Sequence, residues 1–197
     1  MLTLDLLRHG EPVGGRRYRG QIDDPLSDRG WAQMRAALGE ATPWARIVSS
    51  PLARCRAFAE ELSRQRDLPL SLDDRLREVG FGVWEGKSAA EIESETPGAL
   101  ARFKSDPVHA RPHGAESLDS FYQRVAQALD AVLSGHDDEH VLVVGHAGVI
   151  RMALAWALAI PQANAYRIEV ASAKFTRLRF DAGRATLIFH GSVLPEQ

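Results

Sequence analysis

The sequence predicts an α/β fold in which helices cover both faces of an open, largely parallel sheet. Three observations lead to this prediction. Stretches typical of strands alternate with stretches typical of helices along most of the chain. The run "HVLVVG" (140–145) is rich in valine and almost wholly apolar, as in strands buried on both faces. The length of 197 residues, of which 45% are hydrophobic, suits one packed domain of this kind.

The first half of the chain is expected to alternate between strands and helices. Residues 2–7 read as a buried strand that Asp5 interrupts, and residues 13–25 as a loop rich in glycine and arginine. Ser27 is expected to cap a helix over residues 28–39. The other elements predicted here are a strand over 46–49, a helix over about 52–65 that begins near Pro51, and a short edge strand over 70–72.

The second half of the chain begins with an irregular segment, residues 79–114. We expect this segment to form a lid or insertion within a single domain that covers residues 1–197, with short helices inside it. Those helices are predicted over about 88–95 and 98–104. The elements that follow are a helix capped by Ser117 that runs to about residue 133, the strand over 140–145, a helix over 149–159, and a hairpin around residues 181–183.

Composition and charge exclude several classes of function. The formal net charge is −2, from 24 Lys and Arg against 26 Asp and Glu, which provides no general basic field for nucleic acid. Residues 141–160 form the only apolar run of membrane length, but they include Arg151, which would cost roughly 2.5–3.5 kcal/mol at a bilayer centre. Cys55 is the only cysteine, and residues 1–7 are too short for a signal peptide. We therefore expect a cytoplasmic protein without a nucleic-acid or membrane partner.

Polar groups follow three of the predicted strands at the point where each strand ends. These groups are Arg8-His9-Gly10, Ser49-Ser50-Pro51 and Gly145-His146-Ala147-Gly148. Because ligands gather at the carboxyl ends of strands in parallel sheets, we expect the three groups to form one site. Arg54 lies in the first turn of the following helix and can reach the same edge. Gly10 is expected to let the backbone leave strand geometry, so that Arg8 and His9 both turn toward the site.

The predicted site combines two guanidinium groups with two imidazoles, which suits phosphoryl transfer. Arg8 and Arg54 can bind phosphate oxygens bidentately and stabilise the charge of a transferring phosphoryl group. Their positive charges should lower the pKa of His9 from about 6.5 and keep a ring nitrogen free to attack phosphorus. The leaving oxygen also needs a proton donor, and "LREVGFGVWEG" (76–86) provides two candidates, Glu78 and Glu85.

Taken together, these motifs resemble the histidine phosphatase superfamily, also called the phosphoglycerate-mutase-like family. "LLRHGEP", "SSPLARC", "LREVGFGVWEG", "GAES" and "VGHAGVIR" occur in the order seen in that family, over about residues 2–155. The resemblance implies a three-layer α/β/α sandwich and no metal or other cofactor. It also implies that His9 is the phosphorylated nucleophile, that Glu78 is the proton donor, and that the phosphate pocket is made by Arg8, Arg54 and His146.

Residues 18–30, "YRGQIDDPLSDRG", look most like α-ribazole phosphatases and related small bacterial phosphatases. This resemblance assigns Gly20 and Gln21 to substrate binding. It implies a phosphomonoesterase whose partner is a small phosphorylated metabolite such as α-ribazole 5′-phosphate. A phosphoglycerate mutase and a non-catalytic module that binds a phosphorylated ligand stay open as alternatives. Residues 14–17 replace the asparagine-bearing loop typical of mutases, and the choice between a monomer and a homodimer stays open.

Some remaining residues allow more than one interpretation. Arg16, Arg17 and Arg19 form either a solvated loop or a set of additional substrate contacts. Glu116 is either an acid at a helix start or a group behind the site. Cys55 is expected to be a small buried hydrophobic residue.

Possible metal ligands are also present in the sequence. "HDDEH" (136–140) matches an inverted zinc-protease pattern that requires a helix, and we expect a solvated connection there instead. His109 and His113 lack a convincing third ligand.

Overall fold

A computed structural model describes residues 1–40, 43–134 and 139–194. Its strands are β1 (Leu2–Arg8), β2 (Arg46–Ser49), β3 (Leu70–Leu72), β4 (His140–Gly145), β5 (Phe175–Asp181) and β6 (Arg184–Ser192). They form one sheet in the order β3-β2-β4-β1-β5-β6. The strands from β3 to β1 are mutually parallel, whereas β5 runs antiparallel to β1 and β6 antiparallel to β5. The prediction of a largely parallel sheet is therefore confirmed.

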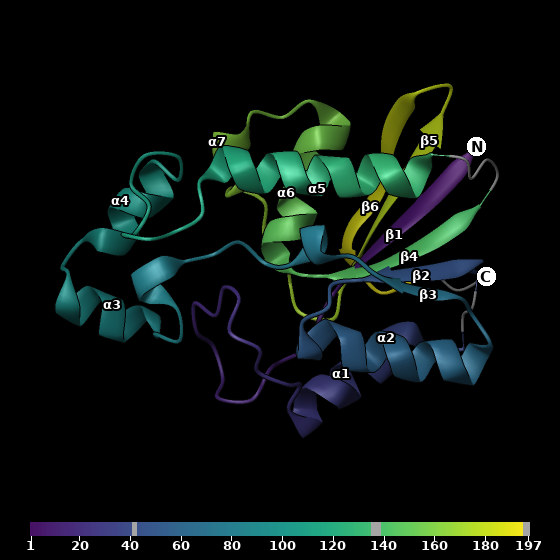
Figure 1. Ribbon diagram of the computed structural model, residues 1–197, viewed down its shortest axis with the longest axis horizontal. Coiled ribbons are helices and arrows are strands. Elements are labelled where there is room, and N and C mark those ends of the chain that lie inside the picture. The colour runs from purple at the N-terminus through teal and green to yellow at the C-terminus, as the bar shows by residue number, and fades with distance from the viewer. Residues whose placement is uncertain (41–42, 135–138, 195–197) are drawn as a thin grey trace.

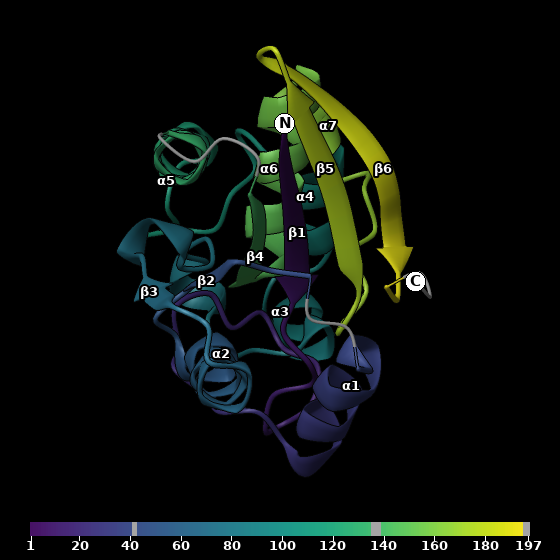
Figure 2. The same cartoon turned by 90° about the vertical axis from the view of Figure 1, so that its right-hand side faces the viewer.

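Helices lie on both sides of this sheet, which confirms the three-layer α/β/α arrangement. The helices are α1 (Asp28–Leu38), α2 (Ala53–Arg66), α3 (Ala89–Glu95), α4 (Ala99–Ser105), α5 (Leu118–Leu133), α6 (Ala147–Leu158) and α7 (Gln162–Ala165). Figures 1 and 2 show α1 and α2 on one face, and α5, α6 and α7 on the other. The helix α6 begins two residues earlier than the sequence predicts, and the short α7 was not predicted.

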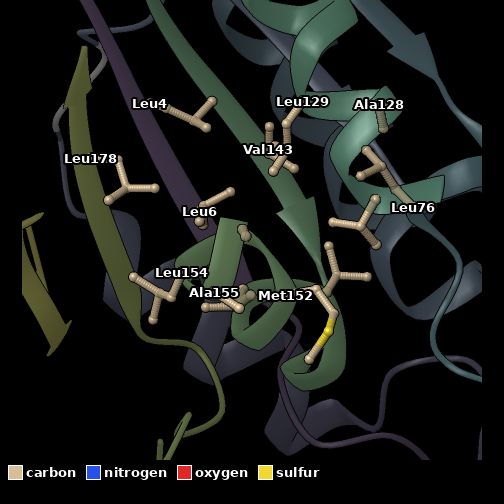
Figure 3. Packing of buried hydrophobic residues seen from close by; sticks show 14 of the residues in the cluster. Leu4, Leu6, Leu76, Ala128, Leu129, Val143, Met152, Leu154, Ala155 and Leu178 are labelled. Carbon is tan, nitrogen blue, oxygen red and sulfur yellow. The ribbon is translucent and has the colours of Figure 1, made fainter. Parts of the chain in front are cut away.

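Alternate side chains of the central strands pack against opposite helical layers, as the two-residue period of a strand requires. Leu4 and Leu6 of β1 join Val143 of β4 in a buried cluster with α5 and α6, and Figure 3 shows this cluster extending to Leu129. Leu7 points the other way, into the cluster that contains α1 and α2. Both faces of the central strands are thus fixed by packing, which leaves the strand ends as the places where polar groups can meet.

Two serines cap helices as the sequence predicts. The Ser27 side chain accepts a hydrogen bond from the backbone N–H of Gly30 at the start of α1. The Ser117 side chain accepts one from the backbone N–H of Ser120 at the start of α5. These bonds satisfy backbone donors that an α-helix leaves unpaired in its first turn.

Residues 79–114 lie beside the carboxyl ends of the parallel strands (Figure 1). They contain a 3₁₀ turn, η2 (Gly82–Trp84), and the helices α3 and α4. Trp84, Ile92 and Phe103 form a small core of their own, against which Tyr18 and Tyr166 pack. The segment thus contacts both the loop after β1 and the end of α7. Its role as a lid stays a prediction.

The apolar run at residues 141–160 folds as a strand, a turn and a helix, namely β4 followed by α6, as predicted. None of the helices in the described part of the chain has the length and hydrophobicity needed to cross a membrane.

Candidate active site

The carboxyl ends of β1, β2 and β4 are neighbours in the sheet, and they bring the predicted residues together. The backbone N–H of His9 donates to the Gly145 carbonyl at 3.0 Å, and that of Ser50 donates to the Val144 carbonyl at 3.0 Å. The rings of His9 and His146 then meet edge to face, with their centroids 5.2 Å apart. Hydrogen bonds between adjacent strand ends therefore place the two histidines side by side.

A hydrogen bond fixes one ring nitrogen of His9, and the other has no hydrogen-bond partner among the described residues. Its Nδ1 lies 2.7 Å from the Gly10 carbonyl oxygen. Because a carbonyl can only accept, Nδ1 carries the hydrogen and the lone pair of the neutral ring is on Nε2. Burial lowers the pKa of His9 well below 6.5, and the charges of Arg54 and Arg8 lower it further. The side chain is therefore held as a neutral imidazole with a lone pair on Nε2.

His146 is completely buried and contacts two residues that follow β2. Its Nε2 lies 2.7 Å from the Ser50 hydroxyl oxygen, and the Cys55 sulfur lies 3.6 Å from the same nitrogen. Burial lowers the pKa of His146 well below 6.5, and Arg54 and His9 add to the shift. Burial also raises the pKa of the Cys55 thiol to about 12, so Cys55 is a neutral buried residue, as predicted. The contact between Ser50 and His146 was missed by the sequence analysis.

In the part of the chain that the structure describes, Arg8 and Arg54 are anchored by backbone carbonyls and not by carboxylates. Arg54 is 1% exposed, and it donates to the carbonyls of Ile22 at 2.6 Å and Gly20 at 2.8 Å. Arg8 donates to the Val170 carbonyl. The Nε atoms of both arginines are buried and have no hydrogen-bond partner in the described residues. Buried donors are rarely left unpaired, so these two N–H groups indicate a site for an anionic ligand.

Glu78 is held at the first turn of α6. Its carboxylate accepts hydrogen bonds from the backbone N–H of Val79 at 2.9 Å and of Gly148 at 3.1 Å. A Cβ atom on Gly148 would lie 2.2 Å from Glu78 Oε1, so this close approach requires glycine. Glu78 thus lies against the helix that His146 precedes, and its role as proton donor stays a prediction.

An ion pair behind Glu78 fixes its backbone. Arg124 pairs with Glu116 at 2.7 Å and donates to the Glu78 carbonyl at 3.1 Å. Glu116 also accepts from the backbone N–H of Gly80 at 3.1 Å. Glu116 therefore lies behind the site, in agreement with the second of its two interpretations.

Glu85, the alternative proton donor, joins its own turn to the loop after β1 through hydrogen bonds with the backbone. Its Oε1 accepts from the backbone N–H of Phe81 at 2.9 Å and of Gln21 at 3.2 Å. Gly20 has a φ of +53°, and a Cβ atom there would lie 2.0 Å from Glu85 Oε1. Gly20 holds Arg54 through its carbonyl, and Gln21 is exposed, with Nε2 3.4 Å from the Glu78 carbonyl. Direct contact of Gly20 and Gln21 with substrate stays a prediction.

Gly10 is required for a reason that the sequence analysis did not find. Its φ is not in the left-handed region, so the backbone does not need glycine for an unusual turn. A Cβ atom on Gly10 would instead lie 2.3 Å from the carbonyl oxygen of Gly30. The loop after β1 therefore packs directly on the backbone of α1, and this contact positions His9.

The three arginines of the loop after β1, namely Arg16, Arg17 and Arg19, lie in different environments. Arg19 is buried, pairs with Asp24 at 2.9 Å and donates to the Val13 carbonyl. The expectation of a solvated Arg19 is therefore wrong, because this side chain holds the loop together, whereas its contact with substrate stays a prediction. Arg17 is exposed and pairs with Glu91 of α3 at 3.2 Å. Arg16 is exposed, and its role in substrate binding stays a prediction.

The possible metal ligands of the sequence do not gather. Within residues 1–40, 43–134 and 139–194, no three His, Cys, Asp or Glu side chains lie where they could hold one metal ion. His109 pairs with Asp106 at 3.0 Å. Residues 136–138 of "HDDEH" lie outside the described residues, and His140 bonds to Asp5 at 2.9 Å.

Fold and site together define the class: a phosphoglycerate-mutase-like α/β/α protein with paired histidines and arginines at the carboxyl ends of its strands. The model of the histidine phosphatase superfamily (branch 1) matches residues 4–192, so the chain belongs to that superfamily.

Relatives of known name extend this comparison. A bifunctional protein of Mycobacterium tuberculosis is 35% identical over 188 residues, which are 93% of this chain and 51% of that protein. The chain thus spans about half the length of that relative. A solved mycobacterial glucosyl-3-phosphoglycerate phosphatase in complex with VO3 has a TM-score of 0.87 and 32% identity, covering 96% of this chain and 98% of that one. The adenosylcobalamin/alpha-ribazole phosphatase of Salmonella typhimurium is 29% identical over 94% of each chain.

Proposed function

We propose that this protein is a phosphomonoesterase that works through a phosphohistidine at His9 and needs no metal. One observation carries the proposal. A neutral His9 with a free Nε2 lies beside two arginines whose buried Nε donors have no partner in the described residues. Such a site can receive a phosphoryl oxygen with its arginines while His9 attacks the phosphorus.

The reaction would proceed in two displacements. In the first, a bond forms between His9 Nε2 and phosphorus while the ester P–O bond breaks, and Glu78 gives a proton to the leaving oxygen. In the second, water attacks phosphorus, the N–P bond breaks, and Glu78 takes the proton of the water. Arg8, Arg54 and His146 would stabilise the charge on the phosphoryl oxygens in both steps.

The substrate would be a small phosphorylated metabolite. The resemblance of residues 18–30 and the Salmonella relative favour α-ribazole 5′-phosphate and a role in cobalamin biosynthesis. The mycobacterial relative favours glucosyl-3-phosphoglycerate. The single buried cysteine is consistent with a cytoplasmic location.

The test is to trap the intermediate. The protein is mixed with a ³²P-labelled substrate, quenched in base, and digested to find the labelled peptide. We expect an acid-labile, base-stable label on His9, absent from His9→Ala and retained in His109→Ala, whose histidine is exposed. Label in the His9→Ala protein would refute the assignment. Transfer of the label back to a sugar acid, with no release of inorganic phosphate, would identify a mutase instead.

A further inference from the structure

Arg151 is a half-buried arginine close to the site, and the proposed mechanism does not use it. It lies on α6 one turn beyond Gly148, and residues three apart lie on the same face of a helix. That face meets Glu78, since the Gly148 N–H binds the Glu78 carboxylate. No carboxylate pairs with Arg151 within the described ranges, in contrast to Arg124, which pairs with Glu116.

The backbone after α7 anchors both Arg151 and Arg8. Arg151 Nε donates to the Ile168 carbonyl at 2.9 Å, while Arg8 donates to the Val170 carbonyl. Two carbonyls two residues apart are separated by at most about 7 Å of chain. Both guanidinium groups are therefore anchored on the same short segment after α7, with Arg8 at the strand end next to His9.

The charges around Arg8 agree with this arrangement. Burial lowers the pKa of the Arg8 guanidinium and the Glu78 carboxylate opposes that shift, while the charges of Arg151, Arg16 and Arg54 add to it. Burial raises the pKa of Tyr18, and the charges of Arg16 and Arg151 oppose it. The positive charges of Arg16 and Arg151 therefore both lower the pKa of Arg8 and of Tyr18.

The Arg151 side chain leaves its terminal nitrogens available. Its Cζ lies 5.5 Å from the centre of the Tyr166 ring, and only its Nε has a hydrogen-bond partner within the described ranges. The two terminal nitrogens of a guanidinium form a planar fork that matches a carboxylate or a phosphate. The aromatic contact and the Nε hydrogen bond hold this fork in place before any ligand binds.

We propose that Arg151 binds a second anionic group, a carboxylate or a phosphate, on the leaving group of the substrate. This inference rests on the proposed phosphomonoesterase activity. Arg8 and Arg54 have unpaired donors beside His9 and serve the reacting phosphoryl group. Arg151 adds a cation beyond them on the side of Glu78, where the leaving oxygen departs. A substrate with an anion on its leaving group would bind this cation, whereas a neutral alcohol would not.

Matched pairs of substrates test the proposal. 3-Phosphoglycerate and glycerol 3-phosphate differ only in a carboxylate against a hydroxymethyl group, and fructose 1,6-bisphosphate and fructose 6-phosphate test a second phosphate. We expect wild type to prefer the anionic member of at least one pair in kcat/KM. Arg151→Gln should lower kcat/KM for that member by about 10- to 100-fold, mainly through KM, because hydrogen bonds to charged groups have this strength. It should change kcat/KM for the neutral member by less than about twofold.

Two further variants separate charge from folding. Arg151→Lys keeps the cation and should retain part of the preference, and Arg56→Gln removes an arginine from an exposed pair on α2 and should retain all of it. Equal losses on both members of a pair in Arg151→Gln, or no preference in wild type, would overturn the inference while leaving the phosphatase activity established. Failure to hydrolyse any of these esters or p-nitrophenyl phosphate would overturn the proposed function, and the inference with it.

Discussion

Strand β1 carries two charged groups, the buried Asp5 in its middle and the half-buried Arg8 at its carboxyl end, and their surroundings differ. Asp5 is fully buried and accepts hydrogen bonds from Arg177 at 2.7 and 2.9 Å, from Trp44 at 2.9 Å and from His140 at 2.9 Å. Burial alone would raise the pKa of Asp5, but the hydrogen bonds to Arg177, His140 and Trp44 outweigh it and hold the pKa below 3.8. Arg8, by contrast, has a buried Nε without a partner among the described residues.

The difference separates charge that stabilises the fold from charge that is available to a ligand. The Asp5 cluster contains its own counter-ion, so its charge is balanced within the protein. Among the described residues, the arginines at the strand ends bind only carbonyls, and Glu78, whose charge acts on Arg8, is bound by backbone N–H groups. A buried cation without a carboxylate is unfavourable by itself, and it becomes favourable when a phosphate binds. We therefore expect substitutions in the two clusters to affect different properties.

The largest expected effect is on catalysis by Glu78. Glu78→Gln should slow hydrolysis of alkyl phosphates by roughly 10²–10⁴-fold, the usual range for general acid catalysis. p-Nitrophenyl phosphate should be affected much less, because its leaving group needs little protonation. Gly148→Ala should cause the same selective defect, since its Cβ would occupy the position of the Glu78 carboxylate. Glu85→Gln, as the control, should affect both substrates equally, because Glu85 binds the backbone of Phe81 and Gln21. A selective defect in Glu85→Gln would reassign the proton donor.

The Asp5 cluster should affect stability. Asp5→Asn should lower the free energy of unfolding by about 3–5 kcal/mol, because it leaves Arg177 without its counter-ion. Urea denaturation measures this change. Glu60→Gln, which removes one partner of an exposed pair with Arg56, should change it by less than about 1 kcal/mol. A loss no greater than that of the control would mean that the Asp5 cluster does not stabilise the fold.

Binding of inorganic phosphate should stabilise the protein through the strand-end arginines and not through the Asp5 cluster. At a phosphate concentration of 100 times Kd, wild type should gain about 2.7 kcal/mol, visible as a rise in Tm. Asp5→Asn should show the same rise from a lower starting temperature, and Arg54→Gln should show little or none. An equal rise in all three proteins would place the phosphate elsewhere.

The smallest expected effect concerns the pH dependence of stability, to which the strand-end histidines and Asp5 should contribute in different pH ranges. His9 and His146 have lowered pKa values in the folded state, so the unfolded chain binds protons first as the pH falls below about 6.5, and stability declines from there. The Asp5 contribution is lost only at lower pH, from about 3.8 downward. Arg54→Gln should weaken the decline below pH 6.5, because Arg54 contributes to both histidine shifts, whereas Asp5→Asn should weaken the decline below 3.8. Denaturation curves at a series of pH values measure both effects. A change below pH 3.8 in Arg54→Gln, or a change in the decline that begins at pH 6.5 in Asp5→Asn, would contradict the prediction.

Much of the fold could be predicted because it depends on local patterns. The valine-rich run of β4, the caps at Ser27 and Ser117 and the hairpin at residues 181–183 are local features, and all of them are found in the structure. The gathering of polar strand ends could also be expected, since parallel strands point their carboxyl ends to one edge.

The remainder depends on contacts between distant residues. Asp5 looked like an interruption of a strand, because nothing near it in the sequence announces Arg177 or Trp44. Gly10 is needed for its contact with Gly30, and Arg19 is buried by its pairing with Asp24 in a loop without regular structure. A short helix such as α7 has too few residues for a periodic pattern.

A direct comparison of Arg54→Gln with Asp5→Asn tests the central claim, that the strand-end charges serve a ligand and the Asp5 charge serves the fold. For each protein, kcat/KM for p-nitrophenyl phosphate is measured together with the free energy of unfolding in urea. Arg54→Gln should lower kcat/KM by roughly 10²–10³-fold, as expected for loss of one stabilising group, and should leave the free energy of unfolding unchanged or raised. Asp5→Asn should keep kcat/KM within about threefold. Its free energy of unfolding should fall by about 3–5 kcal/mol. A loss of stability in Arg54→Gln as large as in Asp5→Asn, with kcat/KM retained, would contradict the account.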